Sequence, residues 1–247
     1  MTCPRLLYQS LILIVFVFGL NLKLTGQMFS VGNQEKERRA FSSTVHLGYS
    51  DVNFKYVGDN PAIKDNPDQS LSMEPSLLHV RYNTPSVSIQ LIGGNTIIGN
   101  ENESLVRLGV ELGTQSYLLR KKRLQFIIPF RVETAITAAT KEGYGQRFYQ
   151  TAFSGGFGGI IAMKPTNFFS IYTEATKWYG FSNSAGNFFG GYTDQFKTKA
   201  TIHLNRLIRG RGVYFSYENL LQNFNIRGID FDYESRVFLF SIGIDIQ

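Results

Sequence analysis

Two neighbouring segments of this chain alternate apolar and other residues with a period of two, and this pattern constrains the fold more than any other feature. Residues 106–112 read VRLGVEL, and residues 126–132 read FIIPFRV. A period of two is typical of a β-strand whose two faces meet different surroundings. One face here is uniformly apolar, and the other carries Arg107, Glu111 and Arg131. The fold must therefore supply two contrasting environments on the two sides of one sheet.

The composition suits a sheet protein rich in turns. Aromatic residues make up 14% of the 247 residues, charged residues 18%, and there are 24 glycines. This favours an all-β fold over a helical bundle. The only cysteine is Cys3, so an internal disulfide is excluded. The formal net charge of +6 is small and scattered along the chain, which argues against a nucleic-acid partner.

The N-terminus has the features of a secretory signal peptide. Arg5 precedes the apolar run LLYQSLILIVFVFGL, and the small residue Gly26 follows soon after. The alternative is a membrane anchor, but the uninterrupted apolar core, 11–20, is shorter than the ~20 residues that a spanning helix needs. We therefore predict a cleaved signal peptide over residues 1–26 and one domain over residues 27–247.

Ten strands are predicted downstream. In strand 43–57 the apolar residues occupy odd-numbered positions up to Tyr49 and even-numbered positions from Val52 onward. This change predicts a bulge near Ser50 and Asp51. Aromatic residues near strand ends, Trp178 among them, are expected at membrane boundaries. The predicted strands are 43–57, 75–83, 86–93, 104–117, 124–139, 147–163, 168–181, 194–204, 212–222 and 235–246.

The connections between these strands are predicted to alternate in length. Short ones at 83–86, 118–123, 164–167 and 205–211 alternate with longer ones at 58–74, 94–103, 140–146, 182–195 and 223–234. An even strand number with short turns on one side and longer loops on the other is typical of an outer-membrane barrel. The predicted fold is therefore all-β: a closed antiparallel up-and-down transmembrane β-barrel of about ten strands. A lipocalin-like cup is the alternative, with its apolar face turned inward.

Residues 41–247 resemble the small outer-membrane β-barrel proteins of Gram-negative bacteria. The similarity rests on the strand pattern, the exported N-terminus and the closing strand SRVFLFSIGIDIQ, which runs to the end of the chain. The final residue of such barrels is usually aromatic, whereas this chain ends Asp245-Ile246-Gln247. The resemblance implies a cell outer-membrane location, outer-membrane lipid around the barrel, and short turns on the periplasmic side.

Charged residues on the second face are predicted to line the interior of the barrel. Unpaired charges in a narrow, partly dry interior are costly, so the two signs should pair. Pairing predicts a structural plug, while a charged constriction in a narrow pore is the alternative. A ten-stranded barrel is narrow, which favours the plug. The predicted lumen-lining residues are Arg81, Arg107, Glu111, Arg131, Glu133, Glu174, Lys197, Lys199, Glu218 and Asp245.

No enzyme motif is evident. The glycine-rich segment 155–159 lies inside a predicted strand and precedes no helix, so it does not form a phosphate loop. His46, His79 and His203 are all expected toward the periplasmic end, away from an outer catalytic rim. His46 and His79 lie on neighbouring strands, but lumen hydrogen bonding is favoured over a metal site. We therefore predict no catalytic, cofactor-binding or metal-binding residues.

The predicted function is that of a non-enzymatic integral outer-membrane protein with a salt-bridged narrow lumen. Its outer loops would be available for a protein or surface partner, because loops 182–195 and 223–234 carry apolar residues such as Phe188 and Phe224. A small porin passing ions or small solutes is the alternative, and an outer-membrane enzyme is a more distant one.

Overall fold

The computed structural model describes residues 43–58, 71–98, 103–142, 148–184, 187–226 and 233–246. The chain divides into two units, Met1–Arg39 and Ala40–Gln247, and only the second falls in these ranges. The predicted signal peptide over residues 1–26 lies outside the described residues. None of the described residues belongs to a helix long and apolar enough to cross a membrane.

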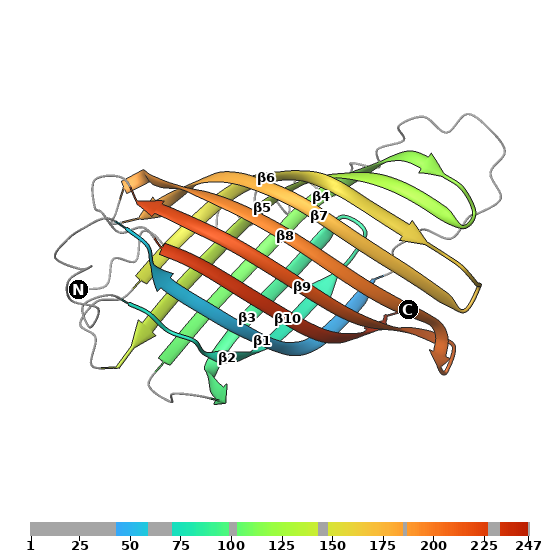
Figure 1. Ribbon diagram of the computed structural model, residues 1–247, viewed down its shortest axis with the longest axis horizontal. Coiled ribbons are helices and arrows are strands. Elements are labelled where there is room, and N and C mark those ends of the chain that lie inside the picture. The colour runs from blue at the N-terminus through green and yellow to red at the C-terminus, as the bar shows by residue number, and fades with distance from the viewer. Residues whose placement is uncertain are drawn as a thin grey trace. The chain divides into compact units, whose positions relative to one another are not determined.

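The second unit is a closed antiparallel barrel (Figure 1). Each strand pairs with its neighbours in the sequence, and β1 pairs with β10 to close the ring. The predicted fold class and the number of strands are confirmed. The strands are β1 (Thr44–Tyr56), β2 (Ser76–Asn83), β3 (Val87–Ile98), β4 (Glu103–Arg120), β5 (Leu124–Lys141), β6 (Phe148–Met163), β7 (Phe169–Ser184), β8 (Asn187–Ile208), β9 (Arg211–Ile226) and β10 (Tyr233–Asp245).

Two of the predicted long connections are wrong, because the chain there continues as paired strand. Residues 182–195 lie almost entirely within β7 and β8, and residues 94–98 extend β3. Glycine in a sequence favours a loop, but in this region it allows close strand packing: a Cβ at Gly191 would overlap the carbonyl oxygen of Asn225 on β9. The strands therefore extend further on this side than the sequence predicted. We call this end of the barrel, which includes the connection between β1 and β2, the long-connection end.

The predicted bulge in the first strand is also wrong. The register of β1 against β10 runs without a shift from Thr44↔Asp245 to Tyr56↔Tyr233. Val52 and Phe54 point inward and are buried, whereas Asn53 and Lys55 point outward. β1 therefore keeps its register, while its outward face changes from apolar to polar and its inward face changes from polar to apolar. This change explains why the apolar residues move from odd-numbered to even-numbered positions in the sequence.

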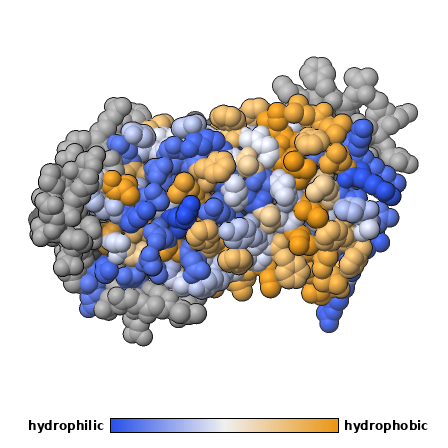
Figure 2. All heavy atoms as spheres, viewed as in Figure 1, coloured by the Kyte–Doolittle hydropathy of each residue, from blue (hydrophilic) through white to orange (hydrophobic). Residues whose placement is uncertain are grey.

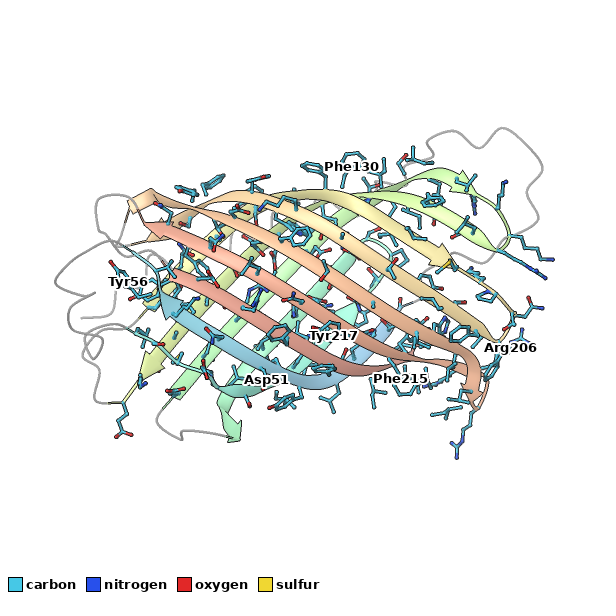
Figure 3. The ribbon with its side chains drawn as sticks, in the orientation of Figure 1. Asp51, Tyr56, Phe130, Arg206, Phe215 and Tyr217 are labelled. Carbon is cyan, nitrogen blue, oxygen red and sulfur yellow. The ribbon has the colours of Figure 1, made fainter. Side chains whose placement is uncertain are left out.

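The outer surface shows the same exchange. Near the short turns, large apolar side chains project from the barrel, including Leu47, Phe215 and Phe240; Phe130, Phe215 and Tyr217 are labelled in Figure 3. Toward the long-connection end of β1 and β10, outward positions are polar, and Lys55 Nζ lies 3.5 Å from Glu234 Oε1, whereas on β6 to β8 the aromatic side chains of Phe153, Phe181 and Tyr192 still project outward. On the face in Figure 2, apolar residues gather in a band near the end where the chain terminates, and hydrophilic residues cover much of the other half. We call these outward apolar residues near the short turns, Leu47, Phe215 and Phe240 among them, the apolar belt.

Trp178, which the sequence placed at a membrane boundary, is buried inside the barrel instead. Trp178 and Glu174 are an even number of residues apart on β7, so their side chains point to the same face of the sheet. The indole Nε1 of Trp178 donates a hydrogen bond to Thr176 Oγ1 at 3.1 Å. The ring covers Gly156 on the neighbouring strand, where a Cβ would overlap the indole. Gly156 therefore makes room for the largest side chain of the interior.

This packing predicts opposite behaviour for two adjacent glycines. Gly156→Ala should lower the melting temperature, because overpacking a filled interior costs about 1–3 kcal/mol. Gly155→Ala is the matched control, since a Cβ there meets nothing within 4 Å. Thermal unfolding of the two variants beside the parent chain measures the difference. Equal melting temperatures for the two variants would show that Trp178 does not lie against Gly156.

Candidate functional site

The interior near the middle of the barrel is held by ion pairs between strands that are not neighbours. Arg81 of β2 binds Glu218 of β9 through two hydrogen bonds, Nη1 to Oε2 at 2.5 Å and Nη2 to Oε1 at 2.9 Å. The side chains of both residues are 5% or less exposed. Since β1 and β10 separate these strands in the sheet, the pair spans the inside of the barrel. Such a bidentate arrangement fixes geometry as well as charge.

Glu111 of β4 is the centre of a second group. Its Oε1 lies 2.9 Å from Arg131 Nη1 of β5, and its Oε2 lies 3.3 Å from Lys197 Nζ of β8. Arg131 also binds Glu174 of β7, with Nη1 2.7 Å from Oε1. One carboxylate and one guanidinium thus connect four strands around the ring. These ion pairs link strands across the interior of the barrel.

A third group lies beside the second. Arg107 Nη2 of β4 donates to Glu133 Oε1 of β5 at 2.9 Å. Gln195 of β8 reaches Glu133 Oε2 at 3.5 Å and Ser154 of β6 at 3.4 Å through its Nε2. Buried charges need both a counter-ion and further hydrogen bonds to offset their lost hydration. This group has both.

The two remaining residues of the predicted set lie differently. Asp245 accepts hydrogen bonds from the Gly212 backbone N–H at 2.9 Å and from the Tyr214 hydroxyl at 2.8 Å. His203 is 3.8 Å from Asp245, and its ring stacks on Tyr214 with centroids 3.9 Å apart. Lys199 forms no ion pair with any residue in the described ranges, although it lines the same interior. Eight of the ten predicted residues thus stand in ion pairs with one another.

Beside the charges, a cavity of about 130 Å³ reaches the turn between β2 and β3. Arg131, Lys197 and Lys199 line its inner part, and Thr84 and Ser86 line its part at the turn. Thr44, Thr201 and Tyr214 add hydroxyl groups to its wall. We call this space the vestibule. It lies toward the short-turn end of the barrel.

Apolar side chains gather in the interior beyond the charges, toward the long-connection end, beside buried polar side chains of β6 to β9. Phe54 is fully buried, and its ring centroid lies 5.0 Å from those of both Phe148 and Tyr233. Met73, in the connection between β1 and β2, exchanges two backbone hydrogen bonds of 2.9 Å with Phe54. We call this cluster the apolar plug; its members are Val52, Phe54, Leu71, Met73, Leu77, Ile92, Leu105, Ala139, Phe148, Leu220, Phe224, Tyr233, Val237 and Leu239.

The sequence analysis missed the apolar plug. The first strand carries a signal, since Val52 and Phe54 are apolar at inward positions, but the same pattern also predicts a bulge. Leu71 and Met73 carried no signal, because a segment outside the strands has no periodicity that would place it inside the barrel. The interior therefore has two sections in series, one charged and one apolar.

The histidines take part in local contacts. His46 Nε2 lies 3.0 Å from Thr44 Oγ1, and His79 Nε2 lies 3.2 Å from Gln90 Nε2. Among the described residues, no group of three or more His, Cys, Asp or Glu side chains is arranged to hold a metal ion. The histidines thus border the charged section.

No protein-family model matches the chain, and no curated protein matches it. Solved structures of outer-membrane barrels are similar to it in fold. The outer membrane protease OmpT of Escherichia coli shares 7% identity, with 82% of this chain and 95% of that chain covered and a TM-score of 0.42. The translocator domain of the autotransporter NalP of Neisseria meningitidis shares 9%, covering 96% and 98%, with a TM-score of 0.31. The attachment invasion locus protein Ail of Yersinia pestis shares 11%, covering 83% and 98%, with a TM-score of 0.23.

The closed ten-stranded barrel of this chain confirms the predicted resemblance at the level of fold. Identities and scores this low assign neither an activity nor a partner to this chain. The function must be argued from the interior and the surface of this barrel itself.

The Arg81–Glu218 pair generates a stability prediction. Glu218→Gln should destabilise the barrel by about 3–5 kcal/mol, because it leaves Arg81 buried without its paired carboxylate. Urea unfolding of the folded protein in lipid vesicles measures the loss. Glu234→Gln is the matched control; its partner Lys55 lies on the outer surface, so the expected change is about 1 kcal/mol or less.

A further variant separates loss of the pair from loss of charge. Arg81→Met with Glu218→Leu removes both ions, and replacing a buried pair by apolar residues is often neutral or stabilising. The double variant should therefore be more stable than Glu218→Gln alone. If Glu218→Gln unfolds at the same urea concentration as the parent chain, the pair does not brace the interior.

Proposed function

We propose that this protein is an integral outer-membrane β-barrel without enzymatic activity whose interior is closed. The observation that carries the proposal is the series arrangement of the charged section and the apolar plug. Ions entering the vestibule meet cross-strand pairs first and a dehydrated aromatic cluster beyond them. Each section narrows the path, because most of its side chains are buried in the described interior.

The apolar belt supports the membrane location. Its residues cover the half of the barrel near the short turns, and lipid is the environment in which so many large outward apolar side chains are stable. Short turns face the periplasm in this architecture. The vestibule then opens toward the periplasm, and the long-connection end lies on the outer side. Export through a cleaved signal peptide is part of this proposal.

The part of the barrel beyond the belt supports a surface role. Its outward residues include two surface ion pairs, Lys55 with Glu234 and Lys177 with Asp194. A closed barrel that extends past the lipid presents a rigid, hydrated wall on the outer side. We propose that this wall and the adjoining connections are where a protein or another surface makes contact.

A small porin is the second candidate, and the vestibule is the observation that favours it. A polar cavity lined by four cationic and two acidic side chains resembles half of a selective pore. The apolar plug, however, lies between this cavity and the other end of the barrel. The porin function requires that plug to move.

Conductance in a planar lipid bilayer separates the two candidates. The purified full-length chain should give no steady current, because the plug closes the interior. Flotation of the same protein with lipid vesicles verifies that it has inserted. A large and steady conductance from the inserted protein would overturn the closed-barrel proposal in favour of the porin.

A further inference from the structure

Lys199 is the one cation of the predicted interior set that stands outside the ion-pair network of the described residues. Its neighbours across both adjacent strands are carboxylates, Glu174 on β7 and Glu218 on β9. Both carboxylates form other ion pairs: Glu174 binds Arg131, and Glu218 binds both terminal nitrogens of the Arg81 guanidinium. The ammonium group of Lys199 therefore has neighbouring carboxylates but no ion pair within 4.0 Å among the described side chains.

The vestibule offers that ammonium a place to bind one. Lys199 lines the cavity together with three further cations, Arg81, Arg131 and Lys197, and only two carboxylates, Glu111 and Glu174. Each of the other three cations has an acidic partner, so the excess positive charge is located at Lys199. A charge in a narrow interior is costly unless something compensates for it.

The wall around Lys199 supplies polar groups as well as charge. Thr201 follows two residues along β8 on the same face, and Thr44, Asn83 and Tyr214 line the same cavity. The amide oxygen of Gln115, another lining residue, is buried and has no hydrogen-bond partner. Hydroxyl groups donate to an oxyanion, whereas the Gln115 amide oxygen only accepts; it can accept from a protonated phosphate oxygen but not from a carboxylate. A space of about 130 Å³ admits a small ion and excludes a large one.

We propose that the vestibule is a binding site for a small oxyanion, a carboxylate or an inorganic phosphate, with Lys199 as its charged anchor. The anion reaches the site from the short-turn end, since the apolar plug closes the other direction. Binding neutralises the excess charge and completes the interior network. The site would work equally in a closed barrel and in a porin, so its test is independent of the conductance measurement.

Isothermal titration calorimetry tests the proposal on the folded full-length chain in a chloride-free zwitterionic buffer. Sodium phosphate and sodium acetate are titrated separately, which distinguishes a phosphate site from a carboxylate site. The parent chain should bind at least one of the two. Lys199→Gln should bind about tenfold more weakly or worse, because it removes a charge-assisted hydrogen bond. Lys199→Arg should retain binding.

Lys55→Gln is the matched control, because it removes a lysine from the outer surface and leaves the vestibule unchanged. Should Lys199→Gln fail to fold, Thr201→Glu provides a second route: it keeps Lys199 and places a carboxylate beside it on the same face of β8. That variant should lose anion binding. Absence of binding to the parent chain, or equal affinity in the parent chain and Lys199→Gln, would overturn the proposal.

Discussion

In the hydrocarbon of a membrane, a backbone N–H or C=O group without a hydrogen-bond partner costs several kcal/mol, and a sheet meets this constraint only when it closes on itself. The pairing of β1 with β10 is the contact that closes this barrel. Closure with ten strands leaves a narrow interior, and a narrow interior has to be filled. The cross-strand ion pairs and the apolar plug are two ways of filling it, in different sections of the same ring.

Along β1, the two sections of the interior correspond to two different surroundings outside. Inward positions of β1 are polar where its outward positions are apolar, and apolar where its outward positions are polar. β1 passes from Leu47 outside and His46 inside to Lys55 outside and Phe54 inside, without any change of register. The first half of β1 is thus inverted relative to a strand of a water-soluble fold, and its second half has the ordinary arrangement of an apolar inward face and a polar outward face.

The sequence predicted the architecture because strand parity carries that information locally. The strand number and the inward parity of Arg81 and Glu218 follow from alternation alone. The partners of these residues do not, because pairs such as Lys197 with Glu111 connect strands far apart in the ring and depend on the tilt and stagger of the closed barrel. Trp178 is an even number of residues from Glu174 on the same strand, so alternation alone places its side chain inside the barrel. The position of Met73 had no periodic signal and required the three-dimensional structure.

The change of surroundings along one strand pair is the central claim of this account, and spin-label accessibility measures it most directly. Single cysteines replace Leu47 and Phe240 in the apolar belt, and Asn53 and Arg236 beyond it, in a chain whose native Cys3 is serine. In lipid bilayers, nitroxides at the first two positions should be relaxed by oxygen, and those at the last two by a water-soluble nickel chelate. Oxygen accessibility at Asn53 and Arg236 equal to that at Leu47 would contradict the account, because lipid would then surround the whole barrel wall.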